Sequence, residues 1–116
     1  MILLLAAAIL VGHHSLAADF DTSQPVRLTG RVEKIEWMNP HVHIYIDVGT
    51  TRWSVEMGSP NGLSERGWTA KTLKIGDLVT VEGLRAKDGS NMANARSIVL
   101  PSGTRLSAAP PEGKTS

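Results

Sequence analysis

The 116-residue sequence predicts an all-β fold: a small five-stranded barrel of the OB type, with a short helix between its third and fourth strands. Apolar and polar residues alternate in several short segments that are separated by turn residues, a pattern typical of half-buried strands. The first segment is long and changes phase midway, as a bent barrel strand does. A helix-start signal follows the third segment. An SH3-like or other small open barrel is the alternative that periodicity leaves open.

Residues 26–37 form the first predicted strand. Its inward residues keep a period of two as far as Val32 and resume at Ile35 on the opposite parity. This change of phase predicts a β-bulge or a strong bend, and Gly30 predicts a close approach of another backbone. The segment is therefore expected to be one long, coiled strand.

Two alternating strands follow, at residues 41–48 and 52–57, joined by a hairpin turn. They place Asp47 opposite Arg52 as a surface ion pair, worth at most about 1 kcal/mol. Residues 58–75 then lose the strand rhythm. Ser59 before Pro60 is an N-cap followed by a first-turn proline, so this segment is predicted to be a short helix and a loop.

The last two predicted strands, residues 78–84 and 91–100, flank a turn that carries an Asp-Gly signal. The barrel domain is therefore expected to span residues 26–101. Residues 13–25 read as an extended lead-in. Residues 102–116, rich in Ala, Pro, Gly, Lys and Ser, read as a disordered tail.

Residues 1–12 are uncharged and almost entirely aliphatic. As a helix they would be about 18 Å long, which is short of the roughly 30 Å core of a bilayer. They are therefore predicted to be a signal peptide, and the mature protein to be periplasmic or secreted with no stable membrane span. Cleavage after Gly12 makes His13 the first residue, whereas cleavage after Ala17 fits the small-residue rule better and removes His13 and His14.

Composition excludes several classes of function. The chain has no cysteine, so disulfides, thiolate metal sites and cysteine nucleophiles are ruled out. Twelve basic and eleven acidic residues give a net charge of +1, which argues against a dedicated nucleic-acid binder. The sequence has no G-x-S-x-G motif, no phosphate-cradling glycine loop and no clear carboxylate pair, so an enzyme is the weakest of three hypotheses.

The four histidines are the candidate metal ligands. His41 and His43 lie two residues apart on a predicted strand, so both side chains point to the same face. With cleavage after Gly12, the amine and ring of His13 could chelate one ion, with His41 as partner and His14 next in line. Nitrogen ligands of this kind suit Cu(II), so copper is the expected cofactor. Outward imidazoles on a half-exposed strand are also common without any metal.

A second set of residues is predicted to form a ligand or partner surface at the barrel mouth. The loop that leaves the third strand carries a glycine, a proline and two side-chain hydrogen bonders, and exposed tryptophans would serve as anchors. A strand-to-helix corner with a cap, and a methionine that belongs to the core, are the competing interpretations. The candidates are Trp37, Asn39, Glu56, Met57, Ser59, Asn61 and Trp68.

Several motifs together resemble those of an uncharacterised family of small exported bacterial proteins. They are His13-His14-Ser15, Glu36-Trp37, Asn39-Pro40-His41, Glu56-Met57-Gly58-Ser59-Pro60-Asn61, Arg66-Gly67-Trp68, Gly76-Asp77, Val81-Glu82-Gly83 and Arg85-Ala86-Lys87-Asp88-Gly89-Ser90. The resemblance implies cleavage just before His13, and it covers His41 but not His43. The resemblance does not indicate any particular activity, because the family has no agreed one.

The sequence thus predicts an exported binding module that holds a copper ion through N-terminal and loop histidines. A metal-free module that binds an envelope protein or another envelope component is the alternative.

Overall fold

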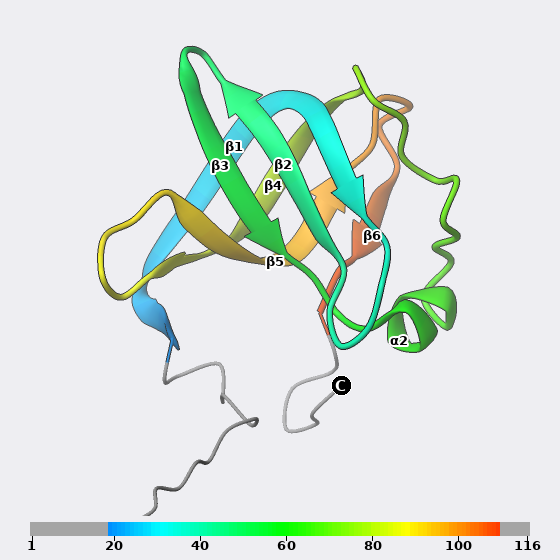
Figure 1. Ribbon diagram of the computed structural model, residues 1–116, viewed down its shortest axis with the longest axis horizontal. Coiled ribbons are helices and arrows are strands. Elements are labelled where there is room, and N and C mark those ends of the chain that lie inside the picture. The colour runs from blue at the N-terminus through cyan, green and yellow to red at the C-terminus, as the bar shows by residue number, and fades with distance from the viewer. Residues whose placement is uncertain (1–18, 110–116) are drawn as a thin grey trace, which may run out of the picture.

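The computed structural model describes residues 19–109, which form strands around a single short helix (Figure 1). In chain order the elements are β1 (Phe20–Glu36), β2 (His43–Val48), β3 (Thr51–Glu56), α2 (Pro60–Ser64), β4 (Leu78–Ala86), β5 (Met92–Val99) and β6 (Arg105–Ser107).

The strands form one sheet in the order β3-β2-β1-β4-β5-β6, and its neighbouring strands are antiparallel. A parallel pairing between β3 and β5 closes the first five strands into a ring. This closure uses only the three residue pairs from Ser54↔Met92 to Glu56↔Asn94, so the ring is not a fully regular barrel. The predicted five-stranded OB-like arrangement is confirmed, and β6 is an additional strand outside the ring.

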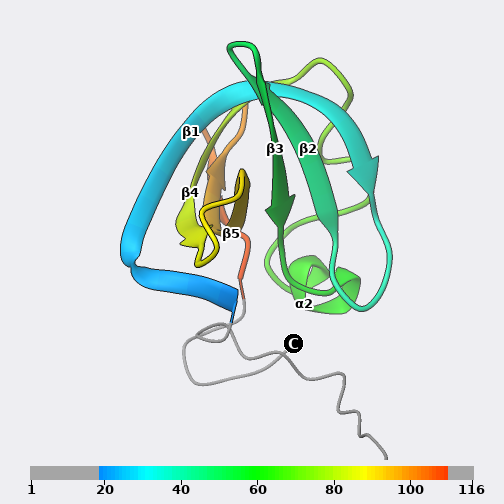
Figure 2. The ribbon, with the colours of Figure 1, turned by 60° about the vertical axis from the view of Figure 1, so that its left-hand side comes forward.

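The bend of β1 lies where the change of phase predicts it. The register between β1 and β2 shifts between Val32 and Lys34, which leaves Glu33 as the extra residue of a bulge. The expected close approach at Gly30 is also present, because a side chain there would overlap the carbonyl group of Asp47. β1 can therefore wrap around the barrel and pair with β2 at one end and β4 at the other (Figure 2).

Both ends of the domain extend beyond the predicted bounds. β1 begins at Phe20, inside the predicted lead-in, because that side chain packs against Leu84 and Ala86 in a small second cluster. The predicted disordered tail differs from the structure over residues 102–109. There Leu106 packs against the main core and Ala108 is fully buried. The predicted signal peptide, most of the lead-in and residues 110–116 lie outside the described residues.

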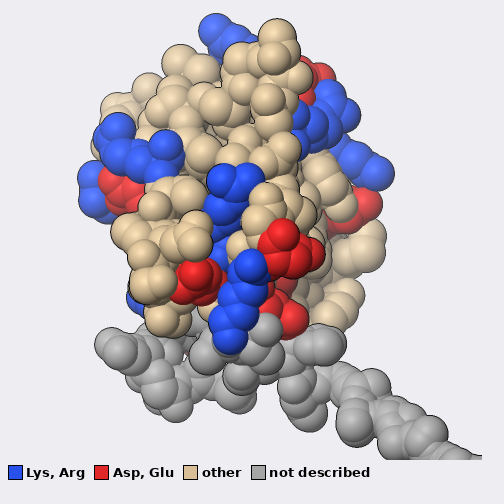
Figure 3. Space-filling model, turned by 90° about the vertical axis from the view of Figure 1, so that its left-hand side faces the viewer, with Lys and Arg blue, Asp and Glu red and all other residues tan. Residues whose placement is uncertain are grey.

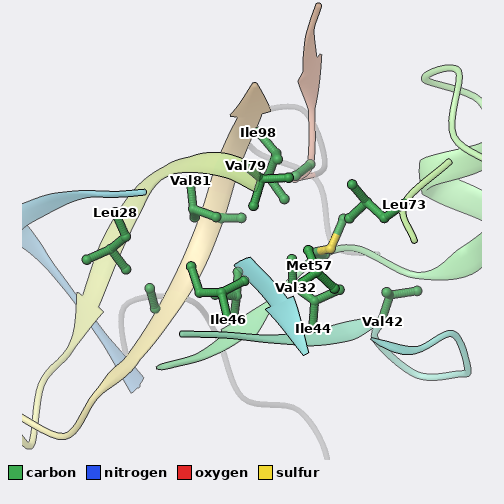
Figure 4. Packing of buried hydrophobic residues seen from close by; sticks show 14 of the residues in the cluster. Leu28, Val32, Val42, Ile44, Ile46, Met57, Leu73, Val79, Val81 and Ile98 are labelled. Carbon is green, nitrogen blue, oxygen red and sulfur yellow. The ribbon is translucent and has the colours of Figure 1, made fainter. Parts of the chain in front are cut away.

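The core fills the interior of the ring with aliphatic side chains from every strand of the ring (Figure 4). Val32, Ile44 and Ile46 have no exposed surface, nor do Val81 and Ile98. These residues are buried because apolar and polar residues alternate in the sequence, and every second residue of a strand points inward. Met57 and Leu73 close the same core near α2 (Figure 4).

Helix α2 follows its predicted signals. The Ser59 hydroxyl accepts a hydrogen bond from the Gly62 amide at 3.0 Å, and Pro60 occupies the first turn. Leu63 is the residue that the helix buries. Figures 1 and 2 show α2 at one end of the barrel, beside the connection between β1 and β2.

Candidate functional site

Much of the motif between Glu56 and Asn61 serves the fold. The amide of Met57 donates to the carbonyl of Val42 at 2.8 Å, and the amide of Val42 donates to the carbonyl of Gly58 at 2.9 Å. The amide of Gly58 then donates to the carbonyl of Ala108. Met57 is 1% exposed, so it belongs to the core and is not part of a ligand wall. Ser59 acts as the helix cap, which leaves the exposed Asn61 and the half-buried Glu56 for contact with a ligand.

Trp68 is also a core residue, and its prediction as an exposed anchor is wrong. Only 1% of its surface is exposed, and its indole N–H donates to the carbonyl of Ser107 at 2.8 Å. Gly67, which precedes it, has a positive φ of 97° that favours glycine. The Arg66-Gly67-Trp68 motif therefore connects the segment that follows α2 to strand β6.

The motif that begins at Arg85 holds the hairpin between β4 and β5. The Arg85 guanidinium donates to the carbonyls of Gly89 and Ser90 and to the side-chain oxygen of Asn91. It also lies 4.9 Å from the centre of the Trp53 ring, within cation–π distance. The Asp88 carboxylate accepts from the Ser90 amide at 2.9 Å. These contacts explain the motif without a ligand.

The connection between β1 and β2, residues 37–42, is different, and we call it the barrel-end loop. Met38 is 56% exposed, and Asn39 and Pro40 are exposed beside it. Trp37 is half-buried, with its inner side against the core. Trp37 also lines a small apolar cavity of about 10 Å³, which has room for one water at most. The loop thus presents polar and apolar groups that the core does not use.

His41 ends this loop and faces Glu56. Its Nδ1 lies 3.4 Å from Oε2 of Glu56, with the two side chains 33% and 21% exposed. His43 stands directly opposite Glu56 on β3 and opposite Glu36 on β1. Directly opposite residues share a face of the sheet, so Glu36, His43 and Glu56 form a row across three strands. His41 precedes β2, so this register places His43 but not His41.

Glu36 is occupied by neighbours on its own face. Its carboxylate lies 3.2 Å from the Lys34 ammonium and accepts a hydrogen bond from the Tyr45 hydroxyl at 3.1 Å. The Lys34 ammonium, followed by the Tyr45 hydroxyl, holds the pKa of Glu36 below its usual range. Glu36 therefore stays ionised and engaged at neutral pH, which leaves Glu56 as the carboxylate beside His41.

Within residues 19–109, no cluster of three or more His, Cys, Asp or Glu side chains is arranged to hold a metal ion. His13 and His14 lie outside the described residues. The start of β1 nevertheless lies at the same end of the barrel as the barrel-end loop and α2, at the bottom of Figures 1 and 2. β1 therefore begins at the end of the barrel where His41 is found.

Charges on the outer surface are mixed. On the face drawn in Figure 3, basic and acidic groups lie side by side. Glu82 contacts both Arg27, at 3.3 Å, and Arg105, at 2.9 Å. The predicted pair of Asp47 and Arg52 is confirmed at 2.8 Å, and the Arg52 guanidinium lowers the pKa of Asp47.

Sequence reasoning missed one surface feature, an open groove of about 550 Å³ along β1, β4 and the end of β5. Its walls include Arg31, whose guanidinium donates to the carbonyl of Gly76 at 3.0 Å, and Leu78, which is 46% exposed. The alternation of β4 could have indicated it, since Val79 and Val81 point inward and Leu78 must then face outward.

Solved structures of TiaS, described as a tRNA(Ile2) agmatidine synthetase, resemble part of this fold. The TiaS–tRNA(Ile2)–ATP complex has a TM-score of 0.52 and 23% identity, covering 70% of this chain and 19% of that chain. The ZRD-deleted mutant in complex with agmatine has a TM-score of 0.53 and 23% identity, covering 81% and 24%. The chain thus spans at most about a quarter of those proteins, and the likeness concerns the fold alone.

No curated protein matches the sequence. In the part of the chain that the structure describes, no helix is long and apolar enough to cross a membrane. A family of unknown function, DUF6152, matches residues 2–95. The match includes most of the barrel and the barrel-end loop, and the chain belongs to this family.

Proposed function

We propose that this protein is an exported binding module that holds a copper ion at the end of its barrel, with His41 as a ligand and the N-terminal histidines as its partners. The observation that carries the proposal is the position of His41. It is one-third exposed, faces a carboxylate and lies outside the core, directly after the exposed residues Asn39 and Pro40.

The chain geometry supports a contribution from His13. Asp19 lies six positions after His13, and an extended chain of six residues reaches about 20 Å. β1 begins at the end of the barrel where the barrel-end loop lies, so a reach of this size is compatible with a His13 ligand at that end (Figure 2). A mature chain that starts at His13 would bring an amine and an imidazole nitrogen to the loop.

The ligand chemistry favours copper. Cu(II) prefers nitrogen ligands in a planar arrangement, and an N-terminal histidine supplies two such nitrogens from a single residue. His41 would supply the third and His14 would be next in line, while His43, on the same face, would be a weaker candidate. The absence of cysteine leaves imidazole and amine as the strongest ligands the chain can offer.

Native mass spectrometry of the protein exported to a bacterial periplasm and supplied with copper tests this proposal. We expect a chain that starts at His13 and retains one copper ion. We expect H13A and H41A to lose that ion, while E65Q, which changes an exposed residue at the end of α2, retains it. A chain that starts at Ala18, or one that starts at His13 and retains no copper, contradicts the proposal.

A metal-free interaction module is the second candidate, and the apolar part of the barrel-end loop favours it. Met38 is 56% exposed beside the half-buried Trp37, and aromatic residues often anchor interfaces. Under this alternative, an envelope partner shifts the fluorescence of Trp37 and copper does not. A W37F variant that abolishes the shift would assign the signal to this residue, because Trp53 and Trp68 are buried.

A further inference from the structure

Glu56 and His41 are held together by the backbone beneath them. Val42 follows His41 in the sequence and Met57 follows Glu56, and both are buried. A backbone hydrogen bond of 2.8 Å joins Val42 to Met57, and a second of 2.9 Å joins Val42 to Gly58. The inner face of this corner is packed into the core, so the outward neighbours His41 and Glu56 have little freedom to separate. Their contact at 3.4 Å is thus a built feature of the fold.

The contact has a consequence for the imidazole. A carboxylate can only accept a hydrogen bond, so the ring nitrogen that faces it is the one that carries the proton. Since Nδ1 lies 3.4 Å from Glu56, this contact favours the neutral tautomer of His41 that has its proton on Nδ1 and its lone pair on Nε2. A histidine oriented in this way through a carboxylate is the arrangement that supports metal ligands in many proteins.

We propose that Glu56 is a positioning residue that fixes His41 in the Nδ1–H tautomer and thereby selects Nε2 as the metal-binding nitrogen. The role of Glu56 in metal affinity rests on the proposed function, whereas its effect on the tautomer does not. Glu56 itself need not touch the ion.

The first measurement is the ¹⁵N NMR spectrum of the histidine rings in the metal-free mature protein at pH 8, above the ordinary imidazole pKa of about 6.5. It distinguishes a protonated from an unprotonated ring nitrogen at each histidine. We expect the Nδ1–H form at His41 in the wild type and in E56Q, whose amide oxygen can still accept the bond. In E56A we expect the Nε2–H form to become populated. A thermal melt of each variant verifies folding.

The second measurement is copper affinity by competitive titration. We expect E56A to weaken binding about 10- to 100-fold, which is the usual effect of removing a carboxylate behind a metal-binding histidine. E56Q should fall between E56A and the wild type, because a neutral acceptor makes a weaker bond than a charged one. E65Q, the carboxylate control on α2, should match the wild type.

The outcomes separate the two proposals. If His41 has the same tautomer in the wild type and in folded E56A, the positioning role is refuted, whatever copper does. If the tautomer changes in E56A but copper affinity does not, Glu56 orients a histidine that is not a ligand, and the metal part of this inference falls. If no variant or wild-type protein binds copper, the proposed function fails while the tautomer result stands.

Discussion

Replacing Trp68 with alanine should destabilise the domain more than a change at Trp37, although both residues line the small apolar cavity. Trp68 is 1% exposed and donates its indole N–H to Ser107. Truncation of a buried tryptophan costs about 3–5 kcal/mol through lost burial and the cavity left behind. In a domain of this size each kcal/mol lowers the melting temperature by roughly 4–8 °C, so W68A should melt at least about 12 °C lower.

The assay is thermal unfolding followed by circular dichroism at pH 7, with W68F and W37A for comparison. W68F keeps most of the ring and loses the hydrogen bond to Ser107, which is worth about 0.5–1.5 kcal/mol, so it should fall between W68A and the wild type. W37A removes a half-buried side chain and should cost less than W68A. If W68A melts within 3 °C of the wild type, or W37A proves the more destabilised, the assignment of Trp68 to the core is wrong.

Two further predictions concern the sheet. G30A should destabilise the domain by about 1–3 kcal/mol in chemical denaturation, because the new methyl group would overlap the carbonyl of Asp47. G58A should be nearly neutral, because its methyl group would make only ordinary van der Waals contacts with Ala108 and Leu63. The pKa of Glu82 is lowered, mainly by the Ser97 hydroxyl, so its contribution to stability is present above its ordinary value of 4.5 and is lost as the pH falls below it. The melting temperature should therefore drop below about pH 4.5, and less steeply in E82Q; equal slopes would refute this.

Alternation was enough to predict most of the sheet. β2, β3 and β4 bury one face only, so their period of two is visible in the sequence, and the bulge of β1 appears as a change of parity. The start of β1 and strand β6 could not be predicted from alternation, because neither segment shows a period of two. Phe20 pairs with a distant strand across a polar stretch, and the three residues of β6 are too few to show a period.

The candidate site was predicted only as far as a single strand allows. The i and i+2 spacing placed His41 and His43 on one face, but it gave no information on what would stand opposite them. Glu56 comes from β3, and it meets His41 where backbone hydrogen bonds join Val42 to Met57 and Gly58. The irregular segment around Trp68 has no periodicity, so the sequence allows this tryptophan either to pack inward or to serve as an exposed anchor.

The motifs of this chain divide into two groups once the contacts of each residue are known. Ser59, Trp68 and Arg85 use their side chains to form a cap, a corner and a turn of the fold, and Gly58 contributes backbone hydrogen bonds. By contrast, the exposed residues Met38, Asn39 and Pro40 of the barrel-end loop and the half-buried side chain of Glu56 lie outside the core.

These two groups meet at one hydrogen-bonded corner, where Val42, Met57 and Gly58 are linked in turn to Ala108. A substitution that loosens this corner would separate His41 from Glu56 without touching either side chain. Loss of copper in a variant of Gly58 or Trp68 would therefore report on the corner and not on a ligand. Only variants that keep the melting temperature of the wild type can assign metal ligands, and for this reason the H41A and E56A measurements must be paired with thermal unfolding.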